Sequence, residues 1–426
     1  MSYFSNLLTS IFEKKSYLKN FIVGFEKTKK ENLLEITDLI LQNKSEASSI
    51  IYSKTFFDVY NKLTETKKKK FFLDLLTNYN IEIDMLNKYV VNYKRNNSLD
   101  DFKNITILSE PKWIELFKKL NTAPGATFNL VKMREALLKF VKGNEELKKI
   151  DIGFQKLFQN WFNPGFLVLQ PIDWNTPANI LEKIIQYEAV HEISSWDDLR
   201  ARLEPKDRKC FAFFHPAIYE EPLIFVEIAL MKEIPNKISS ILKNKRVEID
   251  PNECNSAIFY SISNCQPGLK GVTFGNFLLK NVAEELNKNF PSLQNFSTLS
   301  PVPSFYKWVT ESDTKLNKDL PLEEILNFVK NNNNYLTEKI FSYLTVSNRK
   351  DRSANDPVSR FHLGNGAILE RINYLGDESL SSLKNSLGFM VNYKYELKKL
   401  EKNHEEYNSR KKIIYNNEIK KNLKNI

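Results

Sequence analysis

Histidine is scarce in this 426-residue chain, so each of its four histidines is a candidate for a specific role. His362 has an uncommon setting, Arg-Phe-His-Leu-Gly-Asn-Gly-Ala, in which Gly364 and Gly366 follow closely. An imidazole, with a reference pKa of about 6.5, can act as a general acid or base near neutral pH. His215, which precedes a proline at the end of a predicted strand, is the competing candidate.

Ser300 is a second candidate for a catalytic role. It ends another predicted strand, in the stretch Phe-Ser-Thr-Leu-Ser-Pro-Val-Pro-Ser-Phe from Phe296 to Phe305. Pro301 restricts Ser300 to an extended conformation, and ligands of open sheets often lie at strand ends. The serine can equally be a structural residue that closes a strand. Because the chain has no Gly-x-Ser-x-Gly elbow, a hydrolase nucleophile is not indicated.

A glycine-rich turn between a predicted strand and a predicted helix is the third feature. It holds Gly268, Gly271 and Gly275, and Lys270 lies among them. Backbone N–H groups at such a turn can receive a phosphate, because glycine places no Cβ in the way. The spacing is neither GxGxxG nor GxxxxGK[ST], so dinucleotide and nucleoside-triphosphate sites lose their main support, and a purely structural turn stays possible.

The elements that position these residues fall into two groups. Residues 1–110 contain no proline and only one glycine, Gly24, which is typical of successive helices. Asn163-Pro164-Gly165 is a strong turn signal, and a chain of this length suits two cores. We therefore expect an all-helical domain over 1–163 and a second domain over 164–426.

The second domain combines strand-like and helical patterns, so we expect an α+β protein with a mixed α/β domain built on one sheet. A charged C-terminal helix follows a last strand near Tyr393. The predicted strands cover 166–169, 210–215, 223–231 and 257–263, and the predicted helices include 178–187 and 274–286.

Composition excludes several classes of protein. The net charge of +10 accompanies abundant lysine and asparagine throughout, without an arginine-rich arm or ribonucleoprotein motif, so we expect no nucleic-acid partner. No apolar stretch reaches the roughly 18 residues of a membrane span, so we expect no membrane partner. The N-terminus lacks the features of a transit peptide, and the C-terminus is not a peroxisomal signal. We expect a cytoplasmic protein.

The metal ligands that proteins commonly use are not clustered in this sequence. The three cysteines, Cys210, Cys254 and Cys265, are odd in number and lack CxxC spacing. They therefore predict neither a disulfide framework nor a zinc site.

Several uncommon strings occur in an order that resembles malonyl-CoA decarboxylases. The resemblance extends from about Pro124 to Tyr395. The strings are Trp161-Phe-Asn-Pro-Gly-Phe-Leu, Cys210-Phe-Ala-Phe-Phe-His-Pro, Glu221-Pro-Leu-Ile-Phe-Val-Glu, the stretch from Tyr260 to Phe277, Leu299-Ser-Pro-Val-Pro, Phe361-His-Leu-Gly-Asn-Gly-Ala and Val391-Asn-Tyr-Lys-Tyr.

The resemblance implies a helical oligomerisation domain, forming a dimer or tetramer, and a GNAT-like, acetyltransferase-type catalytic domain with a basic C-terminal helix. It implies the conversion of malonyl-CoA to acetyl-CoA and CO2 in fatty-acid or malonate metabolism. It assigns catalysis to Ser300 and His362, and it places Tyr395 and Ser261 near the site. The residues that it assigns to malonyl-CoA binding are Lys270, Gly271, Val272, Thr273, Phe274, Gly275 and Asn276. Thr273 replaces a glutamate of the animal members, so a hydrogen-bonding role there is in doubt.

The implied reaction can proceed without a metal or organic cofactor. The thioester carbonyl is itself the electron sink for the departing carboxylate, so no cofactor is expected and CoA enters as part of the substrate. His362 would protonate the enolate carbon, and Ser300 would orient the substrate or accept a proton. Two alternatives are a GNAT-type acyltransferase that transfers an acyl group from CoA, and a non-catalytic basic scaffold or RNA-binding protein.

We expect activity to survive exhaustive chelation, because no cluster of Cys, His and carboxylate residues has metal-ligand spacing. The measurement is the decarboxylation rate before and after dialysis against EDTA. Activity that disappears on dialysis and returns with a divalent ion would contradict the metal-free prediction.

Overall fold

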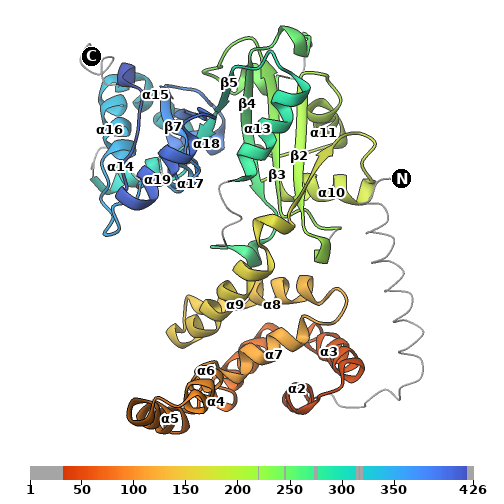
Figure 1. The fold of residues 1–426 in the computed structure, drawn as a ribbon. Helices are drawn as coiled ribbons and strands as arrows, with labels where there is room; N and C mark the ends of the chain where they lie inside the picture. Colours follow the sequence, from red (N-terminus) through yellow and green to blue (C-terminus); the bar gives the residue numbers. More distant parts are fainter. Residues whose placement is uncertain are drawn as a thin grey trace. The chain divides into compact units, whose positions relative to one another are not determined.

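The chain folds into two compact units in a computed structural model (Figure 1), which describes residues 32–419 apart from 219, 244–245, 273–276, 313–315 and 317–319. The helical unit contains the described residues up to Leu167 together with two later segments, 215–218 and 266–272. The sheet unit contains the rest. The predicted division into 1–163 and 164–426 did not anticipate that two short segments would return to the helices, and as a domain boundary it stays a prediction.

The helical unit has no strand among its described residues, as predicted for the N-terminal domain. Helix α7 illustrates why: its residues Trp113, Leu116, Phe117 and Leu120 are spaced by one helical turn and are all buried, while Lys112 and Lys118 are exposed. The helices are α2 (Leu33–Gln42), α3 (Glu46–Tyr60), α4 (Glu65–Asn78), α5 (Ile83–Asn96), α6 (Leu99–Leu108), α7 (Lys112–Leu120), α8 (Ala126–Val141) and α9 (Lys148–Trp161), with 3₁₀ turns η1 (Glu145–Leu147) and η2 (Pro164–Phe166).

The sheet unit is built on one sheet of eight strands in the order β1-β2-β3-β4-β5-β8-β6, with β7 also paired to β8. All neighbours are antiparallel except β4 and β5, which are parallel. The strands are β1 (Val168–Ile172), β2 (Arg208–Phe214), β3 (Ile224–Met231), β4 (Ser256–Asn264), β5 (Asn295–Thr298), β6 (Ser300–Pro301), β7 (Ile368–Asn373) and β8 (Met390–Lys394).

Helices cover the sheet and continue beyond it toward the C-terminus (Figure 1). Leu181 of α10 and Leu199 of α11 belong to one buried cluster with Cys210 of β2, and Ile241 of α12 belongs to another with Ile258 of β4. The helices are α10 (Ala178–Tyr187), α11 (Trp196–Leu203), α12 (Ser239–Leu242), α13 (Phe277–Asn289), α14 (Phe305–Ser312), α15 (Leu322–Asn331), α16 (Asn333–Thr345), α17 (Pro357–Gly364), α18 (Leu380–Ser386) and α19 (Leu400–Arg410), with 3₁₀ turns η3 (Pro216–Ile218), η4 (Pro251–Glu253) and η5 (Pro267–Leu269).

A helical N-terminal region followed by a mixed sheet confirms the predicted α+β fold class. The C-terminal helix is less basic than expected. Helix α19 spans Leu400–Arg410 and contains three glutamates, while Lys398, Lys399, Lys411 and Lys412 flank it. None of the described helices combines the length and the apolar character that crossing a bilayer requires.

The sheet opens between its two parallel strands. Strand β4 pairs with β5 only from Ser256 to Phe259, and the Leu299 N–H then donates to the Phe259 carbonyl. Beyond this point β4 pairs with β3 and no longer with β5, while Ser300 pairs with β8. The β3–β4 register shifts at Tyr260, which indicates a β-bulge that turns β4 further from its neighbour. The opening places the end of β4 and Ser300 on opposite sides of one gap.

Candidate active site

Ser300, His362 and Tyr395 form one hydrogen-bonded chain in the sheet unit. Ser300 Oγ lies 3.0 Å from His362 Nε2, and Tyr395 OH lies 2.7 Å from His362 Nδ1. All three residues are buried. In the sequence, Ser300 and Tyr395 lie 62 and 33 positions from His362. The fold therefore brings two residues assigned to catalysis, and one assigned to their vicinity, into direct contact.

Helix α17 carries His362 in its last turn. The buried Asp356 caps the helix by accepting hydrogen bonds from the N–H groups of Val358 and Ser359, and Pro357 occupies the first helical position. At the other end Gly366 has a φ of 82°, and a Cβ there would lie 2.2 Å from the Leu400 carbonyl oxygen. This glycine therefore lets the chain leave the helix and pass close to the Leu400 carbonyl.

Neutral groups fix the orientation of the imidazole. Tyr393 stacks on the His362 ring at 4.7 Å between centroids. Thr298 Oγ1 accepts from the Tyr393 N–H at 3.1 Å and from the Ser300 hydroxyl at 2.9 Å. Since Ser300 has one proton and donates it to Thr298, His362 Nε2 is the donor to Ser300 and Nδ1 accepts from Tyr395.

Burial determines the electrostatics of this chain. Loss of hydration lowers the pKa of His362 to about 3, and no charged group offsets it. Burial likewise raises the pKa of Tyr395 well above its usual value. Both residues are therefore neutral at pH 7. The ordinary imidazole pKa expected from the sequence is wrong for this buried position.

A cavity of about 220 Å³ lies next to the hydrogen-bonded chain. It occupies the gap at which β4 and β5 separate, and Ser300 and His362 are part of its wall. The other lining residues are Val190, Phe259, Tyr260, Ile262, Asn264, Pro301, Pro357, Val358 and Phe361. Most of this lining is apolar, which suits a reaction that converts a charged carboxylate into neutral CO2.

Ser261 lies in a different cluster from Ser300 and His362. Its hydroxyl donates to the Glu188 carboxylate, at 2.8 and 2.7 Å from the two oxygens. Glu188 Oε1 also accepts from the N–H groups of Val190 and His191. Ser261 thus fastens the segment that places Val190 in the cavity wall. Glu188 was not predicted from the sequence, because no local signal marks it.

The phosphate-binding candidates lie partly in the helical unit. Lys270, Gly271 and Val272 follow η5 there, while Thr273, Phe274, Gly275 and Asn276 lie outside the described residues. The competing histidine, His215, also belongs to the helical unit, with its ring 4.9 Å from that of Phe162. Its Nδ1 accepts from the Ala217 N–H, so it has a structural role in the turn.

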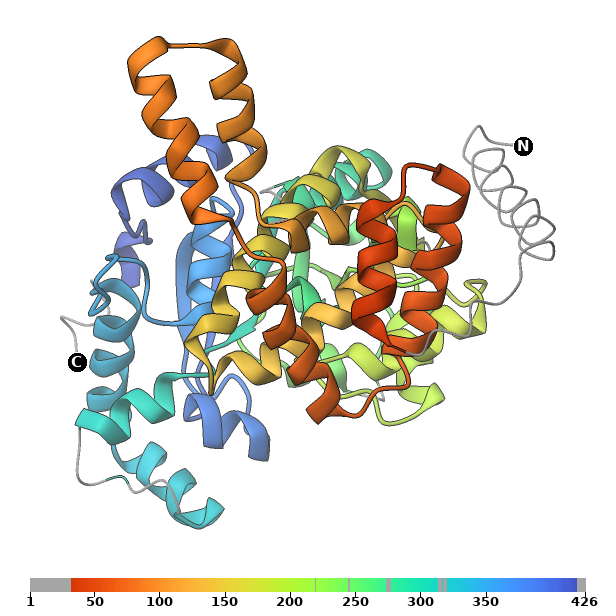
Figure 2. The same cartoon turned by 90° about the horizontal axis from the view of Figure 1, so that it is seen from below.

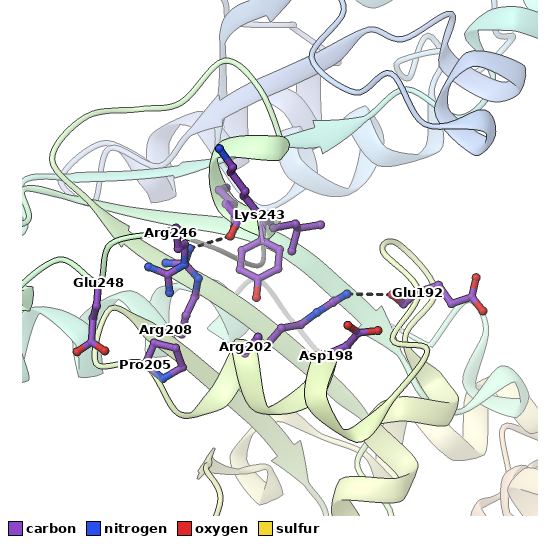
Figure 3. A pocket seen from close by; sticks show the side chains of 12 residues that line it. Glu192, Asp198, Arg202, Pro205, Arg208, Lys243, Arg246 and Glu248 are labelled. Atoms are coloured by element: carbon purple, nitrogen blue, oxygen red, sulfur yellow. Dashed lines mark hydrogen bonds between the residues drawn. The ribbon is translucent and has the colours of Figure 1, made fainter.

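A larger hollow of about 350 Å³ in the sheet unit is lined mostly by charged residues (Figure 3). The fully buried Asp207 accepts from both terminal nitrogens of Arg246, and Arg202 donates to the buried Glu227 at 2.9 Å. Burial raises the pKa of Glu227 to about 7. The Asp207–Arg246 pair joins the loop before β2 to the loop before η4, and the Arg202–Glu227 pair joins α11 to β3, so we assign the hollow to structure. Within the described residues, no three His, Cys, Asp or Glu side chains are placed to hold a metal ion.

A buried serine–imidazole pair beside a mostly apolar cavity defines an enzyme site. Family models match most of the chain: the malonyl-CoA decarboxylase N-terminal domain over residues 79–162, and the malonyl-CoA decarboxylase C-terminal domain over residues 165–426. The chain belongs to the malonyl-CoA decarboxylase family.

Individual relatives agree with these matches. The mitochondrial malonyl-CoA decarboxylase of Anser anser anser is 35% identical over 341 residues, which cover 71% of this chain and 68% of the relative. The mitochondrial malonyl-CoA decarboxylase of Rattus norvegicus is 34% identical over 352 residues, which cover 72% of this chain and 70% of the relative. The crystal structures of malonyl-CoA decarboxylase from Rhodopseudomonas palustris and Agrobacterium vitis are each 40% identical to this chain, with TM-scores of 0.85 and 0.84, and each comparison covers 91% of this chain and 98% of the relative.

The low pKa of His362 predicts a specific dependence of stability on pH. The unfolded chain protonates this residue below about pH 6.5, whereas the folded protein resists protonation until about pH 3. The free energy of unfolding therefore falls progressively as pH is lowered from about 6.5 to about 3, because the unfolded state binds more protons over this range. Between pH 7.5 and 5 the wild type should lose about 2 kcal/mol more than His362→Asn.

Urea denaturation of both proteins at several pH values measures this difference. Other titrating groups, such as Asp356, are present in both proteins and cancel in the comparison. Parallel pH dependences of the two proteins would contradict the assigned pKa.

Proposed function

We propose that this protein decarboxylates malonyl-CoA to acetyl-CoA and CO2 in the cavity beside Ser300 and His362. The observation that carries the proposal is the direct hydrogen bond between these two buried side chains at the wall of that cavity. Family membership supports malonyl-CoA as the substrate.

The reaction breaks the bond between the carboxylate and Cα of the malonyl group. Its electron pair moves into the thioester to form an enolate, and CO2 leaves. A proton then bonds to Cα to give acetyl-CoA, so each turnover consumes one proton. The catalyst must stabilise the enolate oxygen and deliver this proton, and donors aimed at a developing oxyanion contribute about 3 to 4 kcal/mol each.

The substrate supplies a charge that the residues around His362 do not provide. A malonyl carboxylate placed near His362 would raise its pKa, because an opposite charge favours the imidazolium. Substrate binding would then be accompanied by proton uptake. Once the carboxylate has left as CO2, the buried imidazolium is a strong acid beside a basic enolate carbon and transfers its proton. Ser300 orients the carboxylate or accepts a proton, and Tyr395 supports the imidazole through Nδ1.

The remaining components of the proposal follow from the family. Malonyl-CoA binds through the segment from Lys270 to Asn276, with no cofactor and no metal ion. Location in the cytoplasm stays a prediction.

We also infer that the protein forms a homo-oligomer through its helical unit. Helices α5 and α6 make a hairpin (orange in Figure 2) that has no buried residue of its own. Its large exposed apolar side chains are Ile83, Met85, Val90, Val91, Leu99, Phe102 and Ile107. So many apolar groups on one hairpin are costly in water, and a second copy of the hairpin would cover them.

His362→Asn should lower kcat by about 10²-fold or more, because it removes the acid and keeps part of the shape and hydrogen bonding of the side chain. Ser300→Ala should also lower kcat, and the double variant should be little worse than the poorer single variant if the two act as a unit. The measurement is acetyl-CoA by mass after incubation with malonyl-CoA alone. Without an added amine, an acyltransferase would release no CO2.

His215→Asn is the matched control, because it removes a buried histidine far from Ser300 in the sequence and should retain turnover. A folded His362→Asn protein with wild-type turnover would disprove the proposed mechanism. Failure of the wild type to form acetyl-CoA would disprove the proposed function itself.

Charged residues in the hairpin should reduce the size of the assembly. We expect the double variant Leu99→Lys, Phe102→Lys to show a smaller mass than the wild type by light scattering, because it places two cations in the proposed interface. Val247→Lys is the control, since Val247 is an exposed apolar residue of the sheet unit. An unchanged mass for the hairpin variant would place the interface elsewhere.

A further inference from the structure

Arg134 of helix α8 is a buried cation that holds two backbone carbonyls of segment 266–272, which contains the first residues of the proposed substrate-binding segment. Only 1% of the side chain is exposed. Its two terminal nitrogens donate to the carbonyls of Gly268 and Lys270 at 2.7 and 2.8 Å, and its Nε donates to Asp151 at 2.7 Å. The planar guanidinium is suited to this, because its donors have a fixed geometry that a lysine cannot reproduce.

The segment is packed closely against α8 at one point and open at another. A Cβ on Gly268 would lie 2.0 Å from the Val131 carbonyl oxygen, so the backbone touches the helix there. A Cβ on Gly271 would meet no atom closer than Gln155 Oε1, at 3.8 Å. Arg134 thus fixes a turn whose inner end is packed and whose tip is accessible.

The turn is of type II. Lys270 has φ −55° and ψ 127°, Gly271 has φ 80°, and the Val272 N–H donates to the Leu269 carbonyl at 2.9 Å. Turns of types I and II differ mainly in the direction of the central peptide group. Here the carbonyl of that peptide, from Lys270, points to Arg134.

The direction of this carbonyl determines where the Gly271 N–H points. In a trans peptide the C=O and N–H bonds are antiparallel, so the Gly271 N–H points away from Arg134. The Gly271 N–H has no acceptor among the described residues. A cation on the carbonyl oxygen also polarises the peptide and strengthens its N–H as a donor.

We propose that Arg134 is a positioning residue for malonyl-CoA: it holds and polarises the Lys270–Gly271 peptide so that the Gly271 N–H binds a phosphate group of the CoA portion. The proposal rests on the proposed function. Arg134 does not touch the substrate, and it acts through the peptide group that it orients. Gly271 contributes to the same end, because its positive φ is required for the type II turn.

The test compares two substrates, malonyl-CoA and the malonyl thioester of N-acetylcysteamine, which lacks the phosphates. Arg134→Lys keeps the charge but cannot hold both carbonyls, so it should raise the KM for malonyl-CoA by about tenfold with little change in kcat. Its kcat/KM for the short thioester should equal that of the wild type. Gly271→Ala, which disfavours the turn without crowding α8, should show the same split.

The control variant is Lys139→Met, which removes an exposed cation from the same helix. Its kcat and KM should equal those of the wild type with both thioesters. The proposal would be overturned if Arg134→Lys lowered kcat/KM equally with both thioesters. A wild-type KM for malonyl-CoA in Arg134→Lys or in Gly271→Ala would also overturn it. If Arg134→Lys does not fold, the KM of Gly271→Ala for malonyl-CoA tests the proposal. A wild type that binds CoA in calorimetry but forms no acetyl-CoA would instead reject the proposed function, and the affinities of the variants for CoA would still test the role of Arg134.

Discussion

The short pairing of β4 with β5 is the constraint on which the site depends. The two strands are parallel neighbours for only four residues, and each then follows a different partner. Parallel strands that separate leave backbone and side chains of both strands facing a common gap. The bulge at Tyr260 widens the separation, and α17 closes the gap from the other side. The cavity therefore results from the pairing of the strands, and it is lined by residues that are far apart in the sequence.

The environment of His362 is unusual in having only neutral partners. A serine, two tyrosines and the end of a helix surround the imidazole, and no carboxylate compensates a positive charge. A catalytic triad would stabilise the imidazolium in the resting protein, whereas this site disfavours it. In the proposed mechanism the bound malonyl carboxylate raises the pKa of His362, which links formation of the acid to the presence of the substrate.

The helical unit has a role beyond assembly in this interpretation. Segment 266–272 packs with its helices, and the buried Arg134 determines the direction of one peptide group in that segment. Arg134 is paired on one side with Asp151, which also accepts from Gln155. Because Arg134 is buried, displacing either carbonyl or Asp151 would leave part of a buried cation without a hydrogen-bond partner, and this disfavours movement of the turn. A rigid support of this kind suits the recognition of a flexible phosphate chain.

Local patterns in the sequence determined much of the secondary structure. The scarcity of proline and glycine before Pro111 predicted the helices of the first unit, and the apolar runs near Phe211 and Val226 predicted two central strands. These predictions succeeded because they depend on residues close together in the chain. Ser300 and His362 were selected by an uncommon sequence setting and by resemblance to a family.

Tertiary structure decided what those residues can do. The contact of His362 with Tyr395 requires β8 to lie between β5 and β7, which no local pattern indicates. The pKa of His362 depends on complete burial, and burial depends on every element around the cavity. Glu188 and Arg134 gave no signal in the sequence, because the role of each depends on hydrogen bonds to distant segments, with separations of 73 residues for Glu188–Ser261 and 134 for Arg134–Gly268. Their importance is a property of long-range contacts, and these form only in the folded chain.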